Sequence, residues 1–108
     1  MIRGDLIKAV FPGDYGKPRP ALVVQSDRLL ELDSILLCPL TSELNTSGPT
    51  RVLVEPDGGN RLLATSLIMV DKLSAVSRSR CRERIGSVDG AAMERVNGLI
   101  LFVTGLLD

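Results

Sequence analysis

The residue with the best setting for chemistry is Arg19, which stands between Pro18 and Pro20, just before the apolar run 21–24. Each proline fixes its own φ angle and biases the residue before it towards extended backbone. Lys17 and Arg19 are therefore expected in extended backbone at the start of a buried strand. A guanidinium on such a stiff support suits a site that acts on phosphate. A solvated charge at a strand start is the competing interpretation, and this stretch alone does not choose between them.

A pair of hydroxyl residues, Thr41 and Ser42, follows the apolar run 35–40. If a hydroxyl and Arg19 met in one cleft, the guanidinium would offset charge that develops on phosphate oxygens, and the hydroxyl would donate a hydrogen bond to one of them. An ordinary turn after a strand explains Thr41 and Ser42 more simply. The residue types thus allow a phosphate site without requiring one.

Two further side chains have both a chemical and a structural interpretation. Asp71 follows the apolar run 67–70 and could act as an acid or base, or it could be a surface carboxylate paired with Lys72 or an arginine. Tyr15 lies in a glycine-rich loop close to Arg19 in sequence. Its ring could stack on an unpaired base, although a lone loop tyrosine is more often plain surface.

Composition narrows the class of protein. The chain of 108 residues carries 13 basic and 13 acidic side chains, so an anionic partner would have to meet a local patch. Histidine is absent, and no carboxylates gather at ligand spacing, so we expect neither a metal nor another cofactor. The two cysteines lack metal-site spacing, and no apolar run reaches the roughly 18 residues of a membrane span. These features predict one reduced, cytoplasmic domain, residues 1–108, with no membrane segment.

The order of the expected elements indicates a mainly β fold that ends in a helix. Asp89 is a suitable N-cap for that helix, in which Ala92, Val96, Leu99, Val103 and Leu106 form one apolar stripe that packs on the sheet or against a second subunit. Alternation and turn residues predict strands at 2–10, 19–26, 33–42, 51–55, at 67–70 running on to 76, and at 85–88. Such an order predicts a strongly bent antiparallel sheet or small barrel with the helix alongside.

Four stretches, taken together, resemble the MazF/PemK toxin family. They are Arg3-Gly4-Asp5, the segment 17–25 (Lys-Pro-Arg-Pro-Ala-Leu-Val-Val-Gln), Pro39-Leu40-Thr41-Ser42 and the segment 65–72, and the similarity extends through the C-terminal helix. The resemblance implies an SH3-like barrel of the CcdB/PemK toxin type that forms a homodimer. It also implies a type II toxin, a metal-independent, sequence-specific endoribonuclease of single-stranded mRNA that inhibits growth and is held by a MazE-like antitoxin.

The same resemblance assigns roles to residues. In the family, the ribose 2′-OH attacks the adjacent phosphate and leaves a 2′,3′-cyclic phosphate and a 5′-OH. Arg19 matches the catalytic arginine and Thr41 the catalytic threonine, while Asp71 falls at an acidic position that some members use. We expect the RNA contacts to come from Tyr15, Lys17, Ser42 and Lys72.

The chain departs from the family pattern in its first loop, residues 11–17, which is short and lacks the histidine of many members. The proton of the 2′-OH is then left to Asp71 or to the substrate itself. The alternative is a CcdB-like toxin that binds DNA gyrase without catalysis, which residues 24–27 and 102–106 resemble. The CcdB family ends in Trp-Gly-Ile, whereas this chain has Thr104-Gly105-Leu106 without the aromatic residue. The CcdB family also lacks the proline-flanked arginine, so we favour the nuclease.

Overall fold

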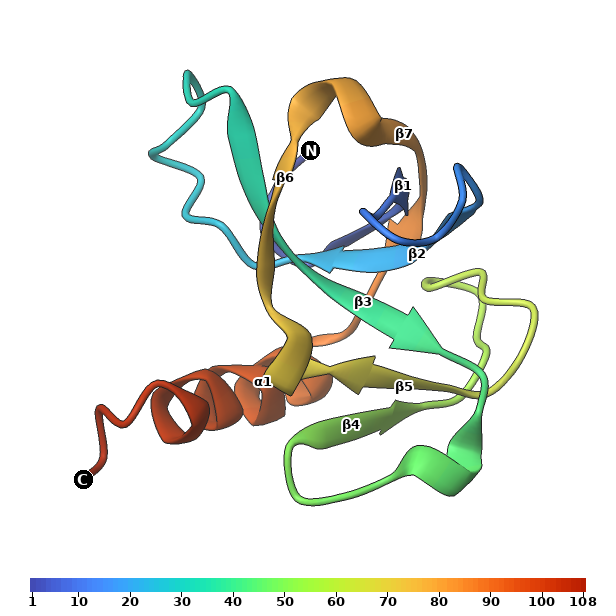
Figure 1. The fold of residues 1–108 in the computed structure, drawn as a ribbon. Helices are drawn as coiled ribbons and strands as arrows, with labels where there is room; N and C mark the ends of the chain where they lie inside the picture. Colours follow the sequence, from blue (N-terminus) through green and yellow to red (C-terminus); the bar gives the residue numbers. More distant parts are fainter.

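The computed structural model describes residues 1–108 and confirms a mainly β fold with one C-terminal helix. Seven strands precede that helix, α1, and three short 3₁₀ turns connect them (Figure 1). The strands are β1 (Asp5–Val10), β2 (Pro18–Val23), β3 (Ser34–Thr41), β4 (Arg51–Val54), β5 (Ser66–Met69), β6 (Ser74–Ser77) and β7 (Cys81–Ser87). The helix α1 spans Gly90–Val103, and the 3₁₀ turns are η1 (Leu44–Thr46), η2 (Val70–Lys72) and η3 (Arg78–Arg80).

All strand pairs are antiparallel, in the order β4-β5-β3-β2-β1-β7. The long strand β3 bends the sheet because its two ends have different partners: Ser34–Leu37 pair with β6, whereas Leu40 and Thr41 pair with β5. The sheet therefore curls round as Figure 1 shows, but β4 and β7 remain at opposite ends of its order. The sheet is therefore strongly bent, as predicted, but hydrogen bonds between β4 and β7 do not close it into a barrel.

The central strands are buried on both faces. Consecutive residues of β2 alternate between two clusters, with Leu22 in the one that faces α1 and Ala21 and Val23 in the other. The same alternation separates Cys38 from Leu37 in β3. Cys38 is a fully buried thiol in this core, and burial raises its pKa to about 12.

Two strand predictions were wrong. The expected strand from 67 to 76 is broken by η2 into two strands. The first, β5, pairs with the end of β3, and the second, β6, pairs with the beginning of β3. The last strand runs over Cys81–Ser87 rather than 85–88. It pairs only with β1, and its charged residues Arg82, Glu83 and Arg84, which do not fit an apolar strand pattern, are those expected of an edge strand.

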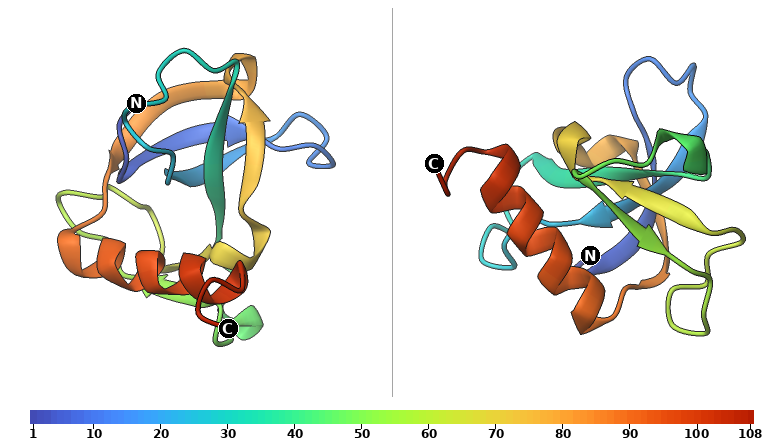
Figure 2. Two further views of the ribbon diagram at one scale, coloured as in Figure 1. Left: turned by 90° about the vertical axis from the view of Figure 1, so that its left-hand side faces the viewer. Right: turned by 90° about the horizontal axis from the view of Figure 1, so that it is seen from below.

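The helix begins as predicted, because the Asp89 side chain accepts a hydrogen bond from the backbone N–H of Ala92 at 2.8 Å. The apolar stripe is only half covered: Ala92 and Val96 are buried, whereas Val103 is exposed. The prediction that Leu106 belongs to the helix was wrong, because α1 ends at Val103 and Leu106 lies exposed in the turn that follows. The C-terminal half of α1 extends away from the sheet (Figures 1 and 2). Neither this helix nor the 3₁₀ turns have the length and apolar character that crossing a membrane requires.

Candidate functional site

A cleft of about 870 Å³ opens where β2 begins and β3 ends. Its walls come from the loop before β2, the start of β2, the end of β3, the segment between β4 and β5, and β7. The loop of residues 11–17 and the loop of residues 55–65 lie on opposite sides of the end of β3 (Figure 2, right). Of the predicted site residues, the cleft brings together Tyr15, Lys17, Arg19, Thr41 and Ser42.

The pairing of β2 with β3 ends at Ala21 and Pro39, and Arg19 and Thr41 each lie two residues beyond it. Ala21 pairs with Pro39 and Val23 with Leu37, so the same register continued to the strand ends places Arg19 opposite Thr41. Arg19 lies two residues from Ala21, and Thr41 lies two residues from Pro39. Side chains two residues apart on a strand share a face of the sheet. Directly opposed Cβ atoms lie about 5 Å apart, so a guanidinium and a hydroxyl can reach one phosphate from here.

Arg19 is held in place by Asp14, a residue of the 11–17 loop for which the sequence predicted no role. The guanidinium Nη2 donates a hydrogen bond to Oδ1 at 3.2 Å, and Nε lies 2.8 Å from the buried Oδ2 without good hydrogen-bond alignment. The ion pair engages one side of the guanidinium and leaves Nη1 without a partner. The signal in the sequence was an acidic residue five positions before an arginine that two prolines hold rigid.

Thr41 has a hydroxyl proton available for a ligand. Its Oγ1 accepts a hydrogen bond from the backbone N–H of Glu43 at 3.1 Å, and the hydroxyl donates to no other group of the protein. Ser42, which lines the cleft beside it, is exposed. The end of β3 therefore presents one positioned hydroxyl and one free hydroxyl.

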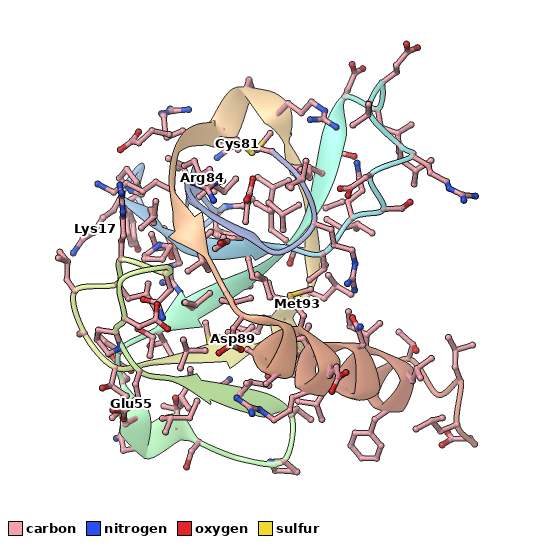
Figure 3. The ribbon with its side chains drawn as sticks, turned by 180° about the vertical axis from the view of Figure 1, so that it is seen from behind. Lys17, Glu55, Cys81, Arg84, Asp89 and Met93 are labelled. Atoms are coloured by element: carbon pink, nitrogen blue, oxygen red, sulfur yellow. The ribbon has the colours of Figure 1, made fainter.

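Tyr15 and Lys17 lie on the loop that leads into β2. Tyr15 is fully exposed and has a left-handed φ of 54°, which turns its side chain away from the body. Lys17 has no ion-pair partner, and its side chain projects outward at the edge of the molecule (Figure 3). Both side chains are free to contact a ligand in the cleft.

The structure does not bring Asp71 or Lys72 into this cleft. Leu67 pairs with Thr41, and β5 runs away from that point, so Met69 is already about 7 Å further along the strand and Asp71 lies beyond it. Asp71 binds Arg51 instead, at 3.1 and 3.2 Å, and accepts a hydrogen bond from the Thr50 hydroxyl. The roles assigned to Asp71 and Lys72 stay predictions that this arrangement does not support.

The ion pair with Arg51 has a consequence for stability. Hydrogen bonds from Arg51 and then Thr50 outweigh partial burial and hold the pKa of Asp71 below its usual range. Because the folded-state pKa is lowered, the stabilisation is present above the ordinary pKa of about 4 and is lost as the pH falls through the lower folded value. Asp71→Asn should therefore lower the free energy of unfolding at pH 7 by about 1 kcal/mol. Denaturant unfolding of both proteins from pH 7 to pH 2 should show the difference shrinking below about pH 4, and a constant difference would contradict this account.

Most basic side chains that line the cleft are already paired with a carboxylate. Its lining includes the basic residues Lys8, Lys17, Arg19, Arg61 and Arg84 and the acidic residues Asp14, Glu43 and Glu83. Three of the cations are paired: Arg19 with Asp14, Lys8 with Glu83 at 3.5 Å, and Arg84 with Asp5 at 3.0 Å. Lys17 and Arg61 remain without an acidic partner, so the unpaired positive charge lies on the two loops that face each other across the cleft.

A comparison with protein families decides the relationship of the chain. The family model of PemK-like, MazF-like toxins of type II toxin–antitoxin systems matches residues 2–103. The chain belongs to this family. The expected relationship to MazF/PemK toxins is confirmed, and the CcdB-like alternative is not favoured.

Individual relatives agree with this membership. A probable endoribonuclease MazF from Mycolicibacterium smegmatis is 34% identical over 107 residues, which is 98% of each chain. An endoribonuclease in complex with its cognate antitoxin, from a mycobacterial species, has a TM-score of 0.82 at 20% identity and covers 98% of this chain and 96% of its own. MazF from Deinococcus radiodurans has a TM-score of 0.80 at 22% identity, covering 97% and 96%. These structures share the MazF/PemK fold with this chain.

Proposed function

We propose that this MazF/PemK-family chain is a toxin that cleaves single-stranded RNA as a metal-independent, sequence-specific endoribonuclease. The observation that carries the proposal is that Arg19 and Thr41 line one cleft, where the β2–β3 register, continued to the strand ends, sets them opposite each other on one face of the sheet. The relative that is named as a probable endoribonuclease, at 34% identity over nearly its whole length, supports the same activity.

The proposed reaction is an internal transfer at phosphorus. The ribose 2′-oxygen attacks the adjacent phosphorus, the O2′–P bond forms and the P–O5′ bond breaks, which gives a 2′,3′-cyclic phosphate and a 5′-OH. The Arg19 guanidinium stabilises the negative charge that grows on the non-bridging oxygens, and the Thr41 hydroxyl donates a hydrogen bond to one of them. Asp14 orients the guanidinium through their ion pair. The 2′-OH proton passes to a non-bridging phosphate oxygen and from there to the departing O5′, so the step needs no protein base, which fits a cleft that Asp71 does not reach.

Tyr15, Lys17 and Ser42 are positioned to contact the RNA around this centre. Lys17 supplies an unpaired cation, and the exposed Tyr15 ring offers a surface on which a base can stack. The sequence specificity follows from the side chains that line the two loops at the rim of the cleft.

The proposal includes two protein partners and a location. The mycobacterial relative in complex with its cognate antitoxin supports a MazE-like antitoxin for this chain. A homodimer is supported by the exposed apolar side chains at the end of α1 and in the turn after it, where Leu101, Phe102 and Leu106 are 41%, 52% and 71% exposed. Cleavage of mRNA requires that the toxin act in the cytoplasm.

The experiment that tests this function is incubation of the purified chain with a mixed-sequence single-stranded RNA in EDTA, followed by sequencing of the cut ends. We expect cuts at a short recurring motif, with a 2′,3′-cyclic phosphate upstream and a 5′-OH downstream. A requirement for Mg²⁺, or fragments with 3′-OH and 5′-phosphate ends, would contradict the mechanism. A DNA gyrase supercoiling assay run in parallel tests the CcdB-like alternative, which predicts inhibition of gyrase and intact RNA.

A further inference from the structure

The loop between β4 and β5, residues 55–65, forms the wall of the cleft opposite Tyr15 and is unusually well anchored. Its centre is Asn60, which is only 1% exposed. The Asn60 side chain donates a hydrogen bond to the Glu55 carbonyl at 2.8 Å and accepts from the N–H groups of Asp57 and Leu62, both at 3.0 Å. A buried amide with all these partners fixes the backbone on both sides of it.

The same loop is also fastened to β7. The backbone N–H of Ser87 donates to the Gly59 carbonyl at 3.0 Å. At Gly86 the Gly59 and Asn60 carbonyl oxygens approach so closely that a Cβ atom would collide with them. The loop therefore has a definite position relative to the sheet that carries Arg19 and Thr41.

This anchoring leaves alternate side chains exposed. Asn60 and Leu62 are buried, whereas Arg61 and Leu63, which line the cleft together with Leu62, are exposed. Arg61 has a left-handed φ of 55°, and Tyr15 is the only other non-glycine residue with a positive φ. Such backbone conformations cost energy and cluster at functional sites. Here both lie at the rims of one cleft.

The exposed side chains have the chemistry of a nucleotide contact. The Arg61 guanidinium makes no hydrogen bond or ion pair within the protein, so its donors are free. Leu63 is 103% exposed and Tyr15 is 101% exposed, the two highest values among the large hydrophobic residues. A single exposed leucine needs no explanation, but this one stands two residues from an unpaired arginine on a rigid loop, across the cleft from the exposed tyrosine.

We propose that Arg61 and Leu63 form a second RNA-binding wall, which holds the nucleotide next to the scissile phosphate on the side away from Tyr15. Arg61 binds a backbone phosphate through its free guanidinium, and Leu63 packs against the adjoining base. The inference rests on the proposed function for its substrate class, single-stranded RNA. It assigns the path of the bound strand across the cleft, which runs between the 11–17 loop and the 55–65 loop past the end of β3.

The test measures binding rather than cleavage. The probe is a fluorescein-labelled pool of short single-stranded RNAs with 2′-O-methyl riboses, which lack the attacking 2′-OH and cannot be cut. Fluorescence anisotropy against salt concentration gives the affinity and its salt dependence. Arg61→Gln should weaken binding about tenfold and reduce the slope of log K against log salt by about 0.7, the value for one lost phosphate contact on a single strand. Leu63→Ala should weaken binding about threefold with the slope unchanged.

The chain offers matched controls in Arg28→Gln and Leu30→Ala. Arg28 and Leu30 have the same spacing as Arg61 and Leu63, are exposed, and lie on the connection at the opposite end of β2, outside the cleft. Both should bind as the unchanged protein does. Equal thermal midpoints for all four variants show that any loss is not one of folding.

The outcomes separate the inference from the proposed function. Loss of binding in Arg61→Gln but not in Arg28→Gln supports the second wall, even if the unchanged protein then fails to cut natural RNA, a failure that would refute the nuclease proposal alone. Equal binding of Arg61→Gln and the unchanged protein overturns the inference, as does an unchanged protein that does not bind the pool. A loss in Arg61→Gln with an unchanged salt slope overturns the phosphate assignment.

Discussion

Arg19→Ala is expected to lower the single-turnover rate constant for RNA cleavage by about a thousandfold, which is the scale for removing a guanidinium or an aligned donor from developing phosphate or oxyanion charge. The reason is geometric as well as electrostatic. Pro18 and Pro20 stiffen the backbone, and Asp14 fixes the guanidinium through contacts at 2.8 and 3.2 Å. Alanine removes a group that is already in position before the substrate binds.

The matched control is Arg28→Ala, which removes an exposed arginine outside the cleft and should leave the rate constant unchanged. The Arg19 side chain is 37% exposed, so its loss should change the free energy of unfolding by no more than about 1 kcal/mol. Arg19→Lys keeps the charge but not the planar fork, and it should recover only part of the activity. An Arg19→Ala protein that cuts RNA at the normal rate would remove Arg19 from the mechanism.

Thr41→Val should lower the same rate constant by about a hundredfold, since valine keeps the shape of threonine and loses the donor. The hydroxyl oxygen accepts the Glu43 N–H at 3.1 Å, so the variant also loses one partly exposed hydrogen bond, worth about 1 kcal/mol of stability. Thr41→Ser retains the hydroxyl and should cut RNA within about tenfold of the normal rate. Unfolding midpoints measured beside the rates separate the two effects. Equal rates for Thr41→Val and the unchanged protein would show that the hydroxyl is not used.

The parts of the site that could be predicted are those that local sequence determines. The two prolines around Arg19 stiffen its backbone whatever the rest of the chain does, and the apolar runs before Thr41 and after Arg19 predict strands that the structure confirms. The meeting of these two residues depends on strand register, which links positions 22 residues apart. The resemblance to a family suggested it, and the residue pattern alone did not.

What was missed depends on contacts between distant loops. Asp14 looked like one turn residue among several, because its role appears only when the loop folds back on Arg19. Arg61 and Leu63 follow a turn, and only the anchoring of Asn60 reveals which side chains face the cleft. Asp71 had a prominent sequence position, but the direction of β5 carries it away from Thr41.

The wrong prediction of one strand from 67 to 76 has a physical cause. Residues 67–76 read as one continuous strand, but their partner β3 bends, and a straight strand could not pair with both of its ends. The chain therefore turns at Val70–Lys72 and resumes as β6. Bending of this kind depends on the whole sheet, so it left no local signal.

The most direct test of the central claim is a double-mutant cycle on Arg19 and Thr41, with single-turnover cleavage of one RNA by the unchanged protein, Arg19→Ala, Thr41→Val and the double variant. Groups that stabilise the same phosphate are strongly coupled, so the double variant should lose little more than Arg19→Ala does alone. A loss equal to the product of the two single losses, about a hundred thousandfold, would mean that the guanidinium and the hydroxyl act independently.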